Sequence, residues 1–456
     1  MTEPIRIAFL SYFFPPIGGG GTPRSVKFVK YLPGCGYRPL VLTVGPDEGV
    51  FSREFQRDDG QFEELRDIPF DLVQVPHPAR HGIQKRLWQS SRFPWIWAGA
   101  YPWFYDDARP WAYAAAKRLL VEAERRPFSL IYATAGPNST LVAAAKAARR
   151  LEVPWVADLR DLWTVDSLKT FPSRLHYLWL SGLERRTLRS AAAVIANTPI
   201  AGERLRVCLG SRFADRVHVI PNGFDPAEFE AHPLRQRQRR EPITLVHAGT
   251  LYEPGKAASR LGRYRPFDLD NSARSVQPLV EGLKAVHAHS PEIGARFHVR
   301  LLGYAPECSR SYIADSGVSD QVVCEGVRPR REAMAAISEA SALLVLQVAF
   351  ADSDKPVPYV PGKVYEYLAT GNPIVAPVPP GDLRNLLDNT ANAYVADYRR
   401  PEEVAKSLCH LARDYDADCI PRCKPHWLSM YSRVELAKHL AGVFDQVVRN
   451  RPAISE

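Results

Sequence analysis

Residues 6–31 read RIAFLSYFFPPIGGGGTPRSVKFVKY, and this stretch decides the fold class. An apolar run from Arg6 to Ser11 predicts a buried strand, and the segment from Thr22 to Tyr31 has helical spacing. Four glycines, Gly18 to Gly21, lie between the two. Strand, glycine loop and helix in this order predict the first unit of an α/β fold.

The glycine loop itself has two interpretations. Glycines between a strand and a helix let backbone N–H groups approach an anion, so Gly18, Gly19, Gly20 and Gly21 could hold a diphosphate or a sugar. A plain turn that needs positive φ explains the glycines equally well. The residues Ser11 to Ile17 separate strand and glycines, unlike the G-x-G-x-x-G loop of dinucleotide enzymes, which disfavours a dehydrogenase.

The alternation of apolar runs with helical patterns continues along the chain and restarts after a polar, proline-bearing stretch at 226–242. It predicts two doubly wound, Rossmann-like domains, at 1–225 and 241–426, with a hinge near 221–242 and one closing helix in 427–456 that packs back on the first domain. The expected strands are residues 6–11, 39–44, 130–133, 155–157, 193–196, 243–247, 297–302, 322–323, 343–346 and 374–376.

Length and composition agree with two soluble domains. The chain has 456 residues, of which 46% are hydrophobic and 24% charged, and it is too long for a single core. No apolar run approaches the roughly 20 residues that span a bilayer, and residues 1–10 do not resemble a signal peptide. We therefore expect a cytoplasmic protein. The net charge of +9 permits phosphorylated small molecules or an anionic membrane as partners, whereas no nucleic-acid module is present.

Seven cysteines are scattered over the chain, and we expect them to be reduced. Cys419, Cys423 and His426, with Cys409 nearby, only loosely resemble a zinc site because they lack a paired C-x-x-C. Packing is the preferred interpretation, and no metal site is predicted.

A second cluster of interest is PGKVYEYLATGNPIVA, residues 361–376. Pro361 and Gly371 mark the start and end of a helix that carries Lys363 in its first turn and Glu366 one turn later. A helix start with a lysine would hold a diphosphate, and a carboxylate could accept both hydroxyls of a ribose. A surface ion pair would explain the two residues alone, but the flanking Pro-Gly and Gly-Asn-Pro favour a site.

Several motifs together resemble the retaining GT-B glycosyltransferases of family four. They occur in the expected order over nearly the whole chain: FLSYFFPP at 9–16, the glycine loop, PWVADLRD at 154–161, VIPNGFD at 219–225, HAGTL at 247–251 and GKVYEYLATGNPIVA at 362–376. The resemblance implies a donor bound mainly by the C-terminal domain, an acceptor bound by the N-terminal domain, and a last helix that crosses back.

The resemblance also implies roles for single residues. Glu366 would hold the donor ribose, Lys363 would lie near the phosphates, and the basic residue after the HAGTL loop would be Lys256 or Arg260. The donor would be a UDP- or GDP-sugar, with no permanent cofactor or metal, and the acceptor a sugar, a lipid-linked glycan or a small molecule. The expected catalytic residues are Asn138, Lys256, Lys363 and Glu366, and the expected donor-binding residues are Gly18, Gly19, Gly20, Gly21, Gly249, Thr250, Arg260, Gly362, Lys363 and Glu366.

The chain departs from the family at three positions. Thr250 stands where an arginine is more common, and Pro358 stands where many members carry a first glutamate. Asp352 and Asp354 lie close to Pro358 in sequence but are expected in a loop. The histidine of the N-terminal domain is missing from 136–140, where Asn138 could donate a hydrogen bond but cannot act as a base. A nucleotide-sugar epimerase or hydrolase, or a non-catalytic sugar-binding relative, therefore stays open.

Two segments are peculiar to this chain. Residues 88–111 contain five of its nine tryptophans, near Lys85, Arg86 and Arg92, which suits a membrane interface or a sugar or lipid acceptor about as well as core packing. An insertion at 252–277 carries five basic residues and is expected to form a lid or acceptor loop, or a plain solvated loop.

Overall fold

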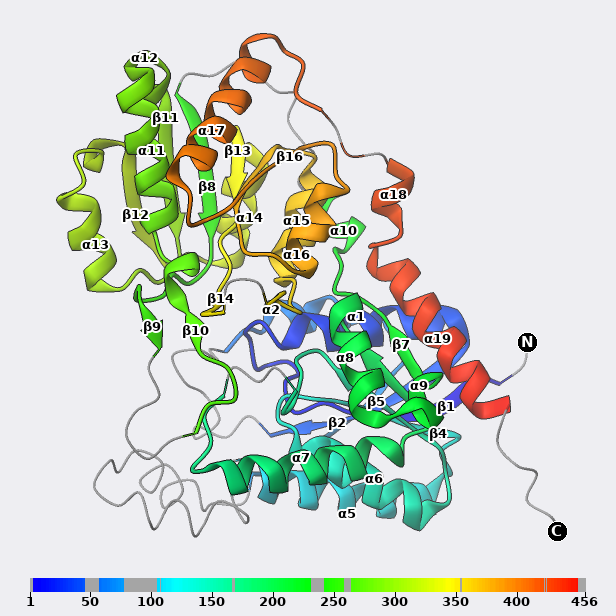
Figure 1. Ribbon diagram of the computed structural model, residues 1–456. Coiled ribbons are helices and arrows are strands. Elements are labelled where there is room, and N and C mark those ends of the chain that lie inside the picture. The colour runs from blue at the N-terminus through cyan, green and yellow to red at the C-terminus, as the bar shows by residue number, and fades with distance from the viewer. Residues whose placement is uncertain are drawn as a thin grey trace. The chain divides into compact units, whose positions relative to one another are not determined.

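The computed structural model describes residues 3–45, 57–77, 105–106, 108–165, 169–230, 242–257, 264–352, 355–421, 423 and 425–449. The chain divides into two compact units. Unit 1 comprises Met1–Pro221, Ser259–Pro266 and Arg433–Glu456, and unit 2 comprises Asn222–Ala258 and Phe267–Ser432. Each unit is built on its own parallel sheet with helices packed against it (Figure 1), which confirms the predicted fold class.

Unit 1 contains a seven-stranded sheet in the order β3-β2-β1-β4-β5-β6-β7, with all neighbouring strands parallel. The chain first moves outward from β1 to β3 and then returns to β4 on the other side of β1. In open sheets of this kind, ligands bind beyond the carboxyl ends of the strands at such a reversal. The strands are β1 (Ile5–Leu10), β2 (Tyr37–Val44), β3 (Asp71–Val75), β4 (Leu130–Thr134), β5 (Trp155–Leu159), β6 (Ala193–Ala196) and β7 (Val217–Val219).

Helices cover both faces of the unit 1 sheet because alternate strand residues point to opposite sides. Ala8 and Leu10 pack in one core, together with apolar side chains of α5, α6 and α7, whereas Ile7 and Phe9 pack in a second core with α1 and α19. The helices are α1 (Thr22–Tyr31), α5 (Arg109–Arg125), α6 (Ser139–Leu151), α7 (Arg174–Arg189) and α19 (Arg433–Arg449).

Unit 2 repeats this architecture with a six-stranded sheet in the order β12-β11-β8-β13-β15-β16, again parallel throughout. Helices α11, α13 and α17 share one core with the sheet, and α14, α15 and α16 share the other. The elements are β8 (Ile243–Ala248), β11 (Phe297–Leu302), β12 (Val322–Gly326), β13 (Ala342–Leu344), β15 (Ile374–Pro377), β16 (Ala393–Ala396), α11 (Gln277–His289), α13 (Glu307–Ala314), α14 (Arg330–Glu339), α15 (Gly362–Thr370), α16 (Asp382–Asp388) and α17 (Pro401–Asp416).

Shorter elements complete the two units. Unit 1 also has α2 (Gly60–Glu63), η1 (Leu32–Cys35), α8 (Pro199–Leu209) and α9 (Ser211–Ala214), and unit 2 has α10 (Pro226–Glu230), α12 (Pro291–Gly294), η3 (Asn271–Arg274), η4 (Ser319–Gln321) and α18 (Pro425–Ser429). A small antiparallel sheet of unit 2 pairs β9 (Lys256–Ala257), β10 (Leu269–Asp270) and β14 (Ala349–Phe350). No helix in the described ranges is long and apolar enough to span a bilayer.

Three features differ from the sequence-based expectation. The single closing helix predicted from Trp427 onward is two helices, α18 and α19, and the boundary between the units falls between them, at Ser432 and Arg433. Residues 222–225 belong to unit 2 rather than to unit 1. The 252–277 insertion, expected to be a loop, contributes β9, β10 and η3, because its two ends pair with each other and with β14.

Candidate functional site

The carboxyl end of β8 in unit 2 brings His247 and Lys363 together. The His247 side chain is fully buried, and its Nδ1 lies 2.9 Å from the carbonyl oxygen of Leu344. A carbonyl can only accept, so Nδ1 carries the proton and Nε2 is left as an acceptor. Nζ of Lys363, in the first turn of α15, lies 3.2 Å from that Nε2 and donates to it. The hydrogen bond fixes the lysine side chain against the end of the strand.

The electrostatic surroundings of Lys363 favour an anionic ligand beside its amine. Burial, followed by the nearby Arg274, holds the pKa of Lys363 well below its usual range, and Glu366 only partly opposes this shift. Burial and Lys363 likewise hold the pKa of His247 far below its usual range, so the imidazole is neutral. Among the described residues, no carboxylate forms an ion pair with Lys363. An anionic ligand would stabilise the protonated amine.

Gly249, two residues beyond His247, gives the lysine its space. Its φ of 156° favours glycine, and a Cβ built on it would lie 2.7 Å from Nζ of Lys363. Any side chain there would displace the amine. The backbone next to the lysine is therefore bare, which would let a phosphate approach the amine closely.

Arg274, at the end of η3, is the basic residue that the structure places beside this loop. Its Nε donates to the carbonyl oxygen of Thr250 at 3.2 Å, and its guanidinium lies 4.3 Å from the ring centroid of Tyr252. The sequence had suggested Lys256 or Arg260 for this role. Lys256 pairs within β9, where only its backbone is described, and Arg260 lies outside the described residues.

Glu366, one turn after Lys363 in α15, takes part in a shared ion pair. Nη2 of Arg330, the first residue of α14, lies 2.9 Å from Oε1 of Glu366 and 2.8 Å from Oε2 of Glu228. Burial lowers the pKa of Arg330, but the two carboxylates outweigh it and raise that pKa. The Glu366 side chain is 18% exposed, so it can still accept hydrogen bonds from a ligand.

Gly362 opens α15 directly after Pro361. Gly362 is exposed, and a Cβ built on it would have no neighbour within 4 Å. The helix start carries unsatisfied N–H groups and partial positive charge on the same element as Lys363. Unit 2 thus gathers His247, Gly249, Thr250, Gly362, Lys363, Glu366, Arg274 and Arg330 around the ends of β8 and the start of α15.

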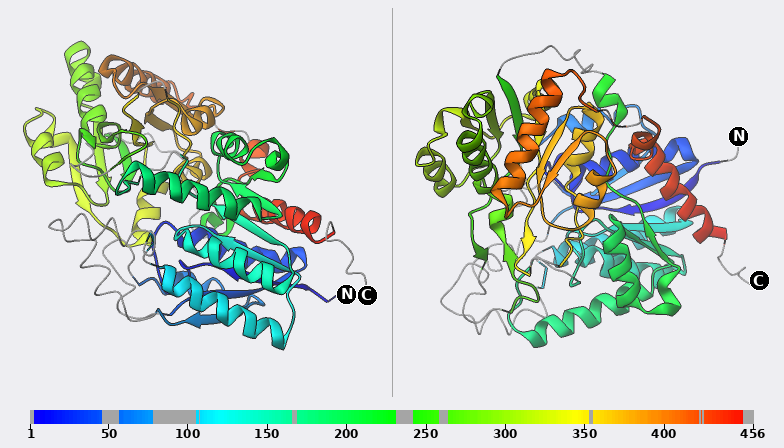
Figure 2. Two further views of the ribbon diagram at one scale, coloured as in Figure 1. Left: turned by 60° about the horizontal axis from the view of Figure 1, so that its bottom comes forward. Right: turned by 45° about the horizontal axis from the view of Figure 1, so that its top comes forward.

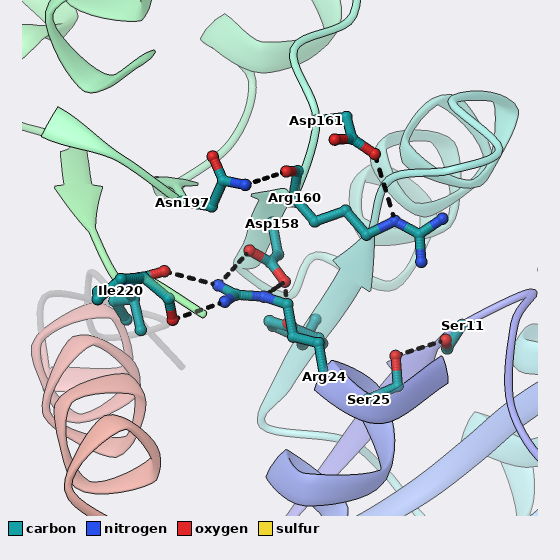
Figure 3. Close-up of polar contacts among 10 residues, drawn as sticks. Ser11, Arg24, Ser25, Asp158, Arg160, Asp161, Asn197 and Ile220 are labelled. Carbon is teal, nitrogen blue, oxygen red and sulfur yellow. Dashed lines mark hydrogen bonds and ion pairs between the residues drawn. The ribbon is translucent and has the colours of Figure 1, made fainter. Parts of the chain in front are cut away.

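Unit 1 has a second basic group at the reversal of its sheet. Arg160 follows β5, and Figure 3 shows its side chain pointing away from the neighbouring Arg24. A Cβ on Gly21 would collide with its guanidinium, and one on Gly136 would lie 2.5 Å from Nη2. The guanidinium therefore lies against both the glycine loop before α1 and the turn after β4. Burial lowers the pKa of Arg160, and the closest carboxylate oxygen, on Asp161, is 3.8 Å from Nε.

Arg24 and Asp158 beside it have a structural role. The buried guanidinium of Arg24 donates from Nε and Nη2 to the two oxygens of Asp158 at 2.8 and 2.9 Å (Figure 3). Arg24 also donates to the carbonyl oxygens of Ile220 and Pro221. These bonds join the first helix, the fifth strand and the segment after β7. They occupy both oxygens of Asp158, so the ion pair of Arg160 is its 3.8 Å contact with Asp161.

The glycines of the loop serve different purposes. Gly19 has a φ of 112°, which favours glycine. Position 21 has no room for a Cβ, because the guanidinium of Arg160 lies against Gly21. Gly20 is exposed, and a Cβ on it would meet no atom within 4 Å. Gly18 is buried at the start of the loop. Within the described residues, packing would therefore allow a side chain at position 20, and a role of Gly20 in ligand binding stays a prediction.

Asn138 is placed near this region by the turn after β4. It is buried at the position before α6, and its side chain makes no capping hydrogen bond there. The carbonyl oxygen of Gly136, two residues earlier, accepts from Nη2 of Arg160 at 3.4 Å. The role of Asn138 as a donor to a ligand stays a prediction.

Other sequence-based candidates lie elsewhere. Most of the aromatic segment, with Lys85, Arg86 and Arg92, lies outside the described residues, and Trp111 is fully buried in α5, which excludes it from a membrane interface. Asp352 is exposed and Asp354 is not described. In the described part of the chain, no group of three or more His, Cys, Asp or Glu side chains could hold a metal ion.

A family comparison agrees with this organisation. Residues 19–223 match the family described as Glycosyl transferase 4-like domain. The match begins in the glycine loop and covers most of unit 1. No curated protein matches the chain.

Solved structures of the same fold extend the comparison to both units. HepE (Alr3699) from Anabaena, in complex with UDP, has a TM-score of 0.55 at 16% identity and aligns over 97% of this chain and 100% of its own. Trehalose-6-phosphate from E. coli, bound with UDP-2-fluoro glucose, has a TM-score of 0.58 at 12% identity over 97% and 99%. The apo form of the lipopolysaccharide outer core galactosyltransferase WaaB has a TM-score of 0.55 at 12% identity and aligns over 97% of this chain and 99% of its own.

At these identities the likeness establishes the fold. The chain has the GT-B fold of two Rossmann-like domains, and the family match together with this fold supports a glycosyltransferase.

Proposed function

We propose that this chain transfers a sugar from a nucleoside diphosphate sugar to an acceptor, with retention of configuration at the anomeric carbon. The observation that carries the proposal is the Lys363 amine, hydrogen-bonded to neutral His247 beside the bare backbone of Gly249, with Glu366 one helical turn away. A diphosphate would meet the amine and the start of α15, and the ribose hydroxyls would donate to Glu366.

UDP is the first donor nucleotide to test. The HepE structures contain UDP, UDP with glucose, and UDP-glucose, and the E. coli structure contains UDP-2-fluoro glucose. These ligands support a uridine donor for this chain, with GDP-sugars as the alternative. The lipopolysaccharide enzymes among the similar structures suggest a saccharide acceptor, which we assign to unit 1 and to the Arg160 region.

The proposed mechanism relies on charge and positioning. As the bond between sugar and diphosphate breaks, negative charge grows on the diphosphate, and Lys363, Arg274 and the N–H groups of α15 would stabilise it. The departing phosphate oxygen can accept the acceptor proton on the same face of the sugar, so no protein nucleophile is needed. Holding the acceptor hydroxyl beside the departing phosphate, on the same face of the sugar, then supplies much of the remaining rate enhancement.

Isothermal titration calorimetry with UDP, GDP and ADP tests the donor site, with Lys363→Met as the variant and Lys406→Met, an exposed lysine on α17, as the matched control. We expect one nucleotide to bind and Lys363→Met alone to weaken it. Donor consumption is then measured with and without saccharide acceptors. Consumption that needs no acceptor would replace transfer by hydrolysis or epimerisation, and binding without any consumption would leave a non-catalytic relative.

A further inference from the structure

Helix α7 of unit 1 has two apolar faces. Leu180, Leu188 and the buried Glu184 lie on the inner face, in or against the core. Leu175 and Leu178 lie on the outer face and are 78% and 51% exposed. An ordinary surface helix presents a polar outer face, so these leucines need an explanation.

The exposed apolar side chains of α7 form one group. Trp179, 42% exposed, follows Leu178 directly, and the spacing of Leu175, Leu178 and Trp179 places all three on the same side of the helix. No other helix in the described ranges carries more than one strongly exposed large apolar side chain. The Trp179 ring also lies 5.9 Å from the Tyr105 ring, which extends the group with a second amphipathic aromatic side chain.

The charge on α7 is entirely positive at its surface. Arg174, Arg185 and Arg186 are exposed, and none forms an ion pair with a carboxylate in the described part of the chain. The single acidic residue of the helix, Glu184, is buried and bonded to Thr164. The exposed arginines therefore have an unbalanced charge next to an apolar stripe.

The neighbouring helix α6 extends the basic surface. Figure 2 shows α5, α6 and α7 on the same face of the unit 1 sheet. The side chains of α6, α7 and the amino ends of the nearby strands line a groove of about 1160 Å³. This end of the sheet is opposite to the strand ends that carry Arg160. The charged residues that line the groove are Lys146, Arg149, Arg186 and Arg216, against Glu152 and Asp215.

We propose that the outer face of α7, with the basic rim of α6, is a docking surface for an anionic lipid bilayer. Leu175, Leu178 and Trp179 would enter the boundary between headgroups and acyl chains, where aromatic side chains are favoured. The arginines would pair with anionic headgroups while their aliphatic stems cover apolar surface. A nucleic acid could pair its phosphates with the arginines but would leave the leucines exposed to water. Exposed apolar side chains together with exposed arginines therefore favour a lipid surface.

The docking surface is independent of the transfer reaction, because it requires neither a donor nor the residues around Lys363. Binding is measured by flotation with vesicles of phosphatidylglycerol and phosphatidylcholine, compared with phosphatidylcholine alone. The comparison is repeated at 0.01 M and 1 M salt, where the screening length falls from about 30 Å to about 3 Å. We expect binding to the anionic vesicles at low salt and at least a tenfold loss at high salt.

Two variants separate the apolar and basic contributions. Leu175→Gln with Leu178→Gln tests the stripe, against Val207→Gln, an equally exposed apolar residue on α8. Arg185→Gln with Arg186→Gln tests the charge, against Lys406→Gln with Arg413→Gln, two exposed basic residues on α17 of unit 2. We expect each α7 pair to lower the bound fraction at least fivefold, with unchanged thermal unfolding and unchanged donor binding, and both control variants to bind like the parent.

Three results would overturn the docking surface. One is absence of binding to anionic vesicles at low salt, and another is equal loss in the α7 pairs and their controls. The third is a dimer in solution that Leu175→Gln with Leu178→Gln dissociates, because a second copy of the chain would then be the occupant of α7. Blue-shifted emission on vesicle binding that Trp179→Phe abolishes would place that ring in the lipid.

Discussion

Arg330 donates from one nitrogen, Nη2, to Glu366 at 2.9 Å and to Glu228 at 2.8 Å, so a single guanidinium group holds the carboxylate assigned to the donor ribose. The contact uses Oε1 of Glu366 and leaves Oε2 for a ligand. Arg330 is about two-fifths exposed, which limits the energy of the pair in the free protein, but it fixes the direction of the carboxylate.

We predict that Glu366→Ala weakens UDP binding by about 1.5 to 3 kcal/mol because the ribose hydroxyls lose a charged acceptor. Titration with UDP and with 2′,3′-dideoxy-UDP checks the cause. The parent should prefer UDP, and Glu366→Ala should bind both alike. An unchanged preference in the variant would remove Glu366 from the ribose site.

Arg330→Met should weaken UDP binding less than Glu366→Ala does, since the carboxylate remains but is no longer oriented. A double-mutant cycle measures the coupling, which we expect to exceed about 0.5 kcal/mol, as for residues in one network. Additive effects of the two substitutions would show that Arg330 serves only the link to Glu228.

Lys363 should make donor binding depend on pH. Burial and Arg274 lower its pKa in the free protein, so the amine loses its proton below the ordinary lysine range near 10.4. A bound diphosphate favours the protonated amine, so binding takes up a proton and affinity falls as pH rises through the lowered pKa. Calorimetry between pH 7.5 and 9.5, above the phosphate titration near 6, isolates this effect. Lys363→Arg, which stays charged, should abolish the pH dependence, and a parent protein with constant affinity over this range would refute it.

The fold was largely predictable because buried parallel strands form continuous β-branched or apolar runs, as in β1 and β8. Strands β3, β7 and β16 of the two large sheets were not predicted, because they are short and carry polar or small residues. Individual site residues such as Lys363 and Gly249 stood in recognisable motifs. The hydrogen bond between Lys363 and His247 could not be predicted from these motifs, because the two residues are 116 positions apart.

Arg160, Arg274 and Arg330 could not be assigned from sequence for a related reason. Arg160 stands in the quoted DLRD motif, yet its contacts with Gly21 and Gly136 exist only once three strand ends are assembled. Arginine at the end of a strand has no periodic signature, and its role follows from what the fold places around it.

Gly20→Val should reduce turnover strongly while leaving thermal unfolding unchanged, because the structure has room for the side chain but a ligand at the loop would not. Gly34→Val in η1, where a Cβ also meets nothing within 4 Å, is the matched control and should behave like the parent. Gly21→Ala should lower stability as well, since it displaces Arg160. Equal losses of activity and stability in Gly20→Val would favour a purely structural loop.

The last prediction concerns Glu184, which is fully buried on the inner face of α7. Its Oε2 accepts hydrogen bonds from the backbone N–H and hydroxyl of Thr164, and its Oε1 has no hydrogen-bond partner among the described residues. Burial raises the pKa of this carboxyl from 4.5 to about 7, although the bonds from Thr164 oppose the shift. The folded protein therefore binds a proton more tightly at this position than the unfolded chain does.

A raised carboxyl pKa stabilises the fold fully below the unfolded value and loses this contribution as pH rises through about 7. The shift corresponds to roughly 3 kcal/mol in the free energy of unfolding. Glu184→Gln keeps the shape and hydrogen bonds without a charge, so we expect it to match the parent at pH 4.5 and to be more stable at pH 8. Urea unfolding at both values, taken as the difference between variant and parent, cancels the other carboxylates. A difference that does not change with pH would mean that Glu184 stays ionised throughout, held by a donor at Oε1 such as a buried water molecule.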